Sequence, residues 1–138
     1  MSVEYWEQAD YGSVLNAQLD RVAALRSQAA RSSAYGTYRQ QGLLYSFAVE
    51  TLYMLLLPEL REGLEETLML MKKMRVADSE EEIEALVEQL PEPYKSLAEA
   101  SPQGFEFVYA SDYLLGQILE RLNKAGLLLR GRTVKVGV

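Results

Sequence analysis

Carboxylates are the side chains in this chain with the most obvious capacity for acid–base or metal chemistry. The 138 residues include 20 Asp and Glu but no Cys and no His, which excludes disulfides, thiolate nucleophiles and histidine-based metal sites or general bases. A metal site would need oxygen ligands alone. The motifs G-x-G-x-x-G, G-x-x-x-x-G-K-[ST], H-E-x-x-H and G-x-S-x-G do not occur. We therefore expect a protein that is not an enzyme and holds neither a cofactor nor a metal.

Two groups of glutamates stand close together in the sequence, within residues 59–66 and within residues 80–84. The first group could bind Mg²⁺ together with other carboxylates, and the second could bind a cation or a basic partner. The second group also matches a capping box, in which the Ser79 hydroxyl accepts from the third amide of a helix and Glu82 reaches back. We interpret both groups as solvent-facing helix surfaces.

The formal net charge of −6 is unevenly distributed along the chain. Residues 1–112 carry nine Lys and Arg against nineteen Asp and Glu, a net charge of −10. Residues 113–138 carry five basic residues against one acidic residue, a net charge of +4. The five are Arg121, Lys124, Arg130, Arg132 and Lys135. A charge split of this kind marks the C-terminal segment as a candidate interaction surface.

Apolar residues at steps of three and four predict helices at about residues 13–32, 37–57, 58–75, 80–90 and 113–125. Pro58 breaks the second run, and Gly126 is placed to cap the last helix. Ser111 and Asp112 are both good N-cap residues for that helix. The alternating residues 105–109 predict a short strand, and residues 127–129 and 132–136 predict a β-hairpin around Arg130 and Gly131.

The second predicted helix is apolar on nearly all sides. Its main inward face is predicted to be Leu44, Phe47, Ala48, Thr51, Leu52 and Leu55. A helix of this kind is buried on several sides or shared with a partner chain, which suggests a homodimer formed through the N-terminal helices. The apolar run at residues 43–57 is too short to span a membrane, and the acidic N-terminus is not a signal peptide. We expect a cytoplasmic protein.

The C-terminal residues resemble the second half of a winged helix-turn-helix domain, in which a helix ends at a "GL" step and a basic two-stranded wing follows. The matching residues are Leu119, Leu122, Gly126, Leu127, Arg130, Gly131, Arg132, Val134 and Val136. Residues 101–138 carry the resemblance best, and residues 80–100 would supply the earlier helices. The chain departs from the family in its long link before the last helix and its very short wing loop. Residues 1–75 have no counterpart in the minimal domain.

The resemblance implies that the last helix reads DNA in the major groove. Gln117 would then pair with adenine and Arg121 with guanine or phosphate. Ser111 and Tyr113 would donate to phosphates. The remaining predicted contacts are Lys124 on the helix and Arg130, Arg132 and Lys135 on the wing. The alternative is that these are ordinary solvent-facing residues and a polar hairpin tip.

These observations together predict a mainly α protein in which an N-terminal helical bundle packs with a C-terminal winged-helix-like unit ending in a short β-hairpin. Residues 1–75 would form the helical body and dimerisation region, and residues 79–138 the winged-helix-like unit. The predicted function is non-enzymatic DNA binding, as a small transcriptional regulator. The alternative is an α-helical module for protein–protein interaction or oligomerisation that does not bind nucleic acid.

Overall fold

Two long antiparallel helices, α1 (Val3–Arg31) and α2 (Tyr35–Leu55), form the first layer of the fold. The computed structural model describes the backbone of residues 3–31 and 35–128, and the side chains of residues 10–31 and 39–128. Leu15, Leu19 and Val22 recur at helical spacing on α1 and are buried against α2 and the core. The Tyr11 hydroxyl donates to the Leu55 carbonyl and accepts from the Leu57 amide, both at 2.9 Å. It thereby ties the N-terminal half of α1 to the end of α2 and to the residues just after it.

The predicted break at Pro58 is confirmed. Leu57 is extended, with φ −63° and ψ 151°, as the residue before a proline prefers. The next segment is two helices rather than one, α3 (Pro58–Arg61) and α4 (Glu65–Val76). Gly63 separates them with a φ of 84°, a conformation that glycine adopts more readily than other residues.

Three further helices complete the described chain: α5 (Glu80–Val87), α6 (Tyr94–Ala100) and α7 (Glu106–Lys124). The Ser79 hydroxyl caps α5 by accepting from the Glu82 amide at 3.2 Å, as the sequence predicts. Gly126 caps α7 with a φ of 70°, and the amides of Gly126 and Leu127 bond back to Asn123 and Leu122. This is the hydrogen-bond pattern of a Schellman motif.

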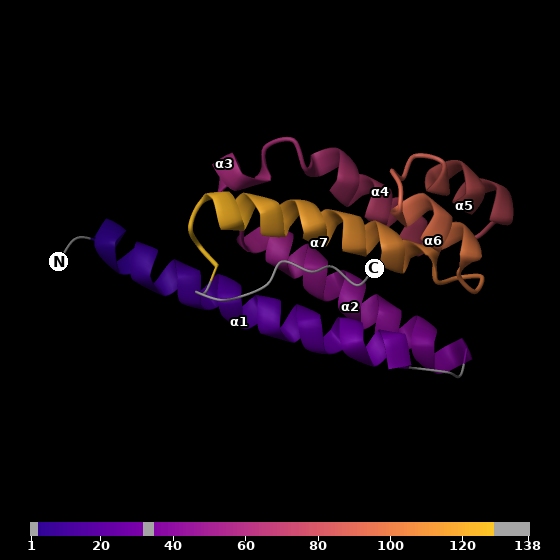
Figure 1. The fold of residues 1–138 in the computed structure, drawn as a ribbon, viewed down its shortest axis with the longest axis horizontal. Helices are drawn as coiled ribbons and strands as arrows, with labels where there is room; N and C mark the ends of the chain where they lie inside the picture. The colour runs from indigo at the N-terminus through magenta and orange to yellow at the C-terminus, as the bar shows by residue number, and fades with distance from the viewer. Residues whose placement is uncertain (1–2, 32–34, 129–138) are drawn as a thin grey trace.

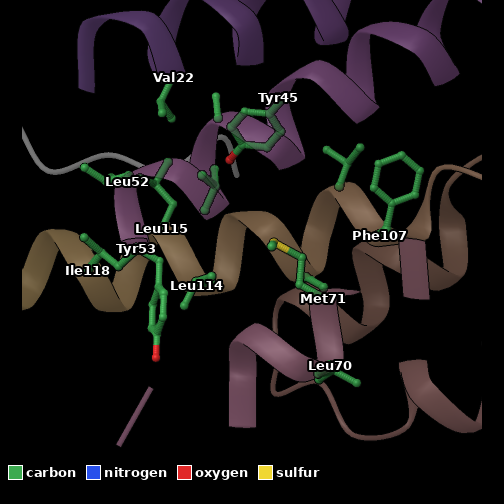
Figure 2. Close-up of a cluster of buried hydrophobic side chains, with 14 of the residues drawn as sticks. Val22, Tyr45, Leu52, Tyr53, Leu70, Met71, Phe107, Leu114, Leu115 and Ile118 are labelled. Atoms are coloured by element: carbon green, nitrogen blue, oxygen red, sulfur yellow. The ribbon is translucent and has the colours of Figure 1, made fainter. Parts of the chain in front are cut away.

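Helix α7 lies at the centre of the molecule (Figure 1). It packs against α2 on one side and against α4 and α6 on the other. In the close-up of the core, the α7 ribbon runs between Tyr45 of α2 and Leu70 of α4 (Figure 2). One buried hydrophobic cluster includes residues from both α1–α2 and α3–α7. The division into residues 1–75 and 79–138 stays a prediction, and these two parts share that core.

The mainly α prediction is correct, but the winged-helix-like unit with a short β-hairpin is contradicted. The structure has no strand in residues 3–31 and 35–128. The strand predicted at 105–109 is instead the first turn of α7, because the buried residues there continue the helical spacing of Leu114 and Ile118. Leu127 and Leu128 are not in a strand, and the rest of the predicted hairpin lies outside the described residues.

Candidate interaction surface and buried polar cluster

The predicted DNA-reading residues do not share an uncovered face of α7. Because this helix begins at Glu106, Ser111 and Asp112 lie in its interior, so the prediction that they cap it is wrong. Both side chains are fully buried, and the Ser111 hydroxyl donates to the Phe107 carbonyl at 2.9 Å. In this arrangement Ser111 cannot reach a phosphate.

The other predicted contacts on α7 are mostly engaged within the protein. Tyr113 is half-buried with its ring centroid 5.3 Å from that of Tyr94. Gln117 is half-buried, and its Nε2 lies 3.4 Å from the Tyr113 hydroxyl. Arg121 donates from Nη1 to the carbonyls of Leu60 at 3.3 Å and Glu62 at 2.7 Å.

Lys124 is the exposed member of the predicted contacts on α7, and it pairs with Glu120 at 3.1 Å. Arg130, Arg132 and Lys135 lie outside the described residues. Among the described residues that were predicted to contact DNA, Lys124 is therefore the one exposed cation.

Asp112 belongs instead to a buried polar cluster that joins three helices. Its carboxylate accepts from Arg26 Nε at 2.9 Å and Arg26 Nη2 at 3.0 Å, and from the Tyr45 hydroxyl at 2.5 Å. These residues come from α7, α1 and α2 respectively. The Arg26 guanidinium also lies over the rings of Tyr45 and Tyr109 at 5.6 and 5.9 Å from their centroids.

The electrostatics of this cluster are dominated by burial. Burial raises the pKa of the Asp112 carboxyl, and the hydrogen bonds and charge of Arg26 oppose that rise without cancelling it. Burial by itself would lower the pKa of Arg26, but the Asp112 carboxylate outweighs it and raises that pKa. Burial and the neighbouring carboxylate also raise the pKa of the Tyr45 hydroxyl well above its usual value. Because Asp112 is fully buried, we assign this cluster to holding the helices together and not to acid–base chemistry.

Sequence reasoning missed this cluster, although a signal was present. Arg26 stands four residues after Val22 on the apolar stripe of α1, and Asp112 stands four residues after Val108 on that of α7. Opposite charges that interrupt two apolar stripes indicate a buried pair.

Glutamates rim a hollow of about 500 Å³ between α5, α6 and the start of α7. They are Glu80, Glu84, Glu88, Glu99 and Glu106. Lys95 pairs with Glu88 at 3.0 Å, and Gln103 donates to Glu80 at 2.9 Å. Among the described residues, no three carboxylates are grouped so as to hold a metal ion. We interpret the hollow as part of an acidic, solvated surface.

Helix α2 carries a solvent-exposed row of side chains, which we call the α2 stripe. It consists of Leu44, Phe47, Thr51 and Met54. Its three apolar side chains are 44%, 50% and 61% exposed. The prediction that Leu44, Phe47 and Thr51 face the core is therefore wrong, because α1 and α7 cover the opposite side of α2, where Tyr45, Val49 and Leu52 are buried.

Arg75 stacks on the ring of Phe47 beside the α2 stripe. The guanidinium of Arg75 lies 4.0 Å from the centroid of the Phe47 ring. Its Nη2 pairs with Glu50 at 2.6 Å, and its Nη1 donates to the Ser46 hydroxyl at 3.2 Å. The stacking supports one face of the ring from within the molecule, while half of the side chain stays open to solvent.

No protein-family model, curated protein or solved structure matches this chain. In the described part of the chain, no helix combines the length and the apolar character that crossing a membrane requires. The family resemblance of the C-terminal residues therefore remains an interpretation of the sequence alone.

Proposed function

We propose that this protein is an α-helical protein–protein interaction module and that the α2 stripe is its contact surface. The observation that carries the proposal is the exposure of Leu44, Phe47 and Met54 in one row on a helix whose other side is buried. Exposed apolar side chains that gather in this way are typical of binding surfaces, whereas scattered ones are not. Aromatic, Met and Arg side chains are also enriched in protein–protein interfaces relative to the rest of the surface.

Two features favour this function over DNA binding. Ser111 and Arg121, two of the predicted DNA contacts, are engaged inside the protein. The segment from residue 58 to residue 106 carries thirteen acidic and five basic residues, and a negative surface repels the phosphate backbone. We expect no measurable binding of a random-sequence DNA duplex in a fluorescence-anisotropy titration at about 50 mM salt. Salt-sensitive binding that the Arg130→Ala/Arg132→Ala variant weakens would instead support DNA binding.

The contact surface is testable by photo-crosslinking in the native cell. A photoreactive amino acid at Phe47 is expected to form a covalent adduct with another polypeptide. The same probe at Glu81, exposed on α5 in the acidic layer, serves as the control and is expected to form none. Absence of any protein adduct at Phe47, or equal adducts at both positions, would refute the proposal.

A further inference from the structure

We infer that a second copy of this chain occupies the α2 stripe, with the two α2 helices antiparallel across a two-fold axis level with Val49. This inference rests on the proposed function and names the partner. Its evidence is the distribution of charge over the two layers of the molecule, together with the order of side chains along the stripe.

Two copies can approach through the α1–α2 layer without strong electrostatic repulsion. From residue 3 to residue 57, which spans α1 and α2, the chain carries five acidic and four basic residues, a net charge of −1. From residue 58 to residue 106 it carries thirteen acidic and five basic residues, a net charge of −8. Like charges facing each other across an interface are unfavourable. An identical partner is therefore favoured at the nearly neutral α1–α2 layer and disfavoured at the acidic layer.

The α2 stripe is also self-complementary. Leu44 and Met54 lie at equal distances in sequence on either side of Val49, and so do Phe47 and Thr51. An antiparallel two-fold arrangement would therefore place Leu44 of one copy on Met54 of the other, and Phe47 on Thr51. The outer pairs match two flexible apolar side chains of similar size, and the inner pairs match a large side chain with a small one.

The arrangement buries no charge that lacks a partner. The α2 stripe contains no charged side chain. The charges beside it are already paired within each copy, with Glu50 bound to Arg75 at 2.6 Å and lying 4.0 Å from Lys72. An interface that leaves no unpaired charge avoids the desolvation cost of burying one.

Sedimentation velocity over a range of concentrations tests the choice of partner. The wild-type chain is expected to self-associate. Phe47→Glu and Thr51→Arg would each place like charges at the two-fold axis and raise the dimer dissociation constant at least about 100-fold. Met69→Glu is the matched control, because Met69 is exposed to a similar degree but faces the acidic layer, and it is expected to leave the constant within about threefold. A wild-type chain that stays monomeric, or a Met69→Glu effect as large as that of Phe47→Glu, would overturn the inference.

Cysteine crosslinking tests the register, since the chain has no cysteine of its own. A mixture of the single variants Leu44→Cys and Met54→Cys is expected to form a disulfide-linked dimer that contains one of each. Either variant alone is expected not to crosslink, because its two cysteines would lie about 15 Å apart along the helix axis, beyond the reach of a disulfide. Crosslinking of Leu44→Cys to itself would overturn the antiparallel register.

Photo-crosslinking at Phe47 separates the two proposals. An adduct with a second copy supports both. An adduct with a different protein, combined with a monomeric purified chain, overturns this inference and leaves the proposed function standing. An adduct within one copy to residues 129–138 would overturn both, since the stripe would then be covered by its own chain.

Discussion

Replacing Asp112 by Ala is expected to destabilise the protein more than any change at its surface. The substitution removes a fully buried carboxylate that accepts two hydrogen bonds from Arg26 and one from Tyr45. The Arg26 guanidinium would keep its charge but lose its partner. Its side chain is 14% exposed, so a little solvent still reaches it. We therefore expect a loss of about 3 kcal/mol in the free energy of unfolding, at the low end for breaking a buried pair.

Two further variants separate the charge pair from its surroundings. Tyr45→Phe removes one hydrogen bond to a charged acceptor and is expected to cost about 2 kcal/mol. The triple variant Arg26→Met/Tyr45→Phe/Asp112→Leu replaces the ion pair and the Tyr45 hydroxyl with apolar groups. It is expected to lie within about 2 kcal/mol of the wild type, because well-packed apolar residues often replace a buried ion pair without loss.

Urea unfolding followed by circular dichroism measures these changes, and a chain of 138 residues is small enough for two-state treatment to be the first assumption. The reasoning would be refuted if Asp112→Ala cost less than about 1 kcal/mol, the size of an ordinary neutral hydrogen bond. It would also be refuted if the triple variant lost as much stability as Asp112→Ala and Tyr45→Phe together, because the residues would then act independently.

Three other predictions follow from the described contacts. Because burial raises the pKa of the Asp112 carboxyl above its usual 3.8, the folded state binds this proton more tightly than the unfolded chain, and the stability linked to its titration is lost as pH rises through the raised pKa. The stability difference between wild type and Asp112→Asn should therefore shrink as pH is raised from below 3.8 in urea titrations, and growth of that difference would contradict the assignment. At Gly42 a Cβ would lie 2.9 Å from a valine methyl of α7, so Gly42→Ala should lower the free energy of unfolding by about 1–3 kcal/mol. Gly12 has open space around it, so the control Gly12→Ala should raise stability by about 0.5–1 kcal/mol in thermal unfolding. Equal effects of the two variants would show that α2 and α7 are not in close contact. Arg121→Ala removes the hydrogen bonds to two carbonyls in and after α3 and should lower stability by about 1–2 kcal/mol, with faster amide exchange in that turn. The control Lys124→Ala loses only an exposed ion pair and should change stability by less than about 0.5 kcal/mol. An unchanged exchange rate in Arg121→Ala would argue against the anchoring role of Arg121.

Local signals in the sequence were sufficient for much of the fold. Proline lacks an amide donor, so Pro58 predicts the end of the second helix wherever that helix packs. Ser79 and Gly126 predict helix ends because their hydrogen bonds close within a few residues of the chain. The apolar spacing of Leu15, Leu19 and Val22 predicts the inward face of α1. These features depend on neighbours in the sequence and can therefore be predicted without a structure.

The tertiary structure decided which surfaces are covered, and with them the candidate site. From the sequence, the last helix was predicted to expose a face that reads DNA. In the structure, the helices on both sides of α7 bury Asp112 and accept hydrogen bonds from Arg121. The sequence also placed Leu44 and Phe47 in the core, whereas α1 and α7 pack on the other side of α2. Helix α2 is apolar nearly all round, so its own periodicity cannot say which side stays open. That choice depends on contacts between residues far apart in the chain, and only the packed structure specifies them.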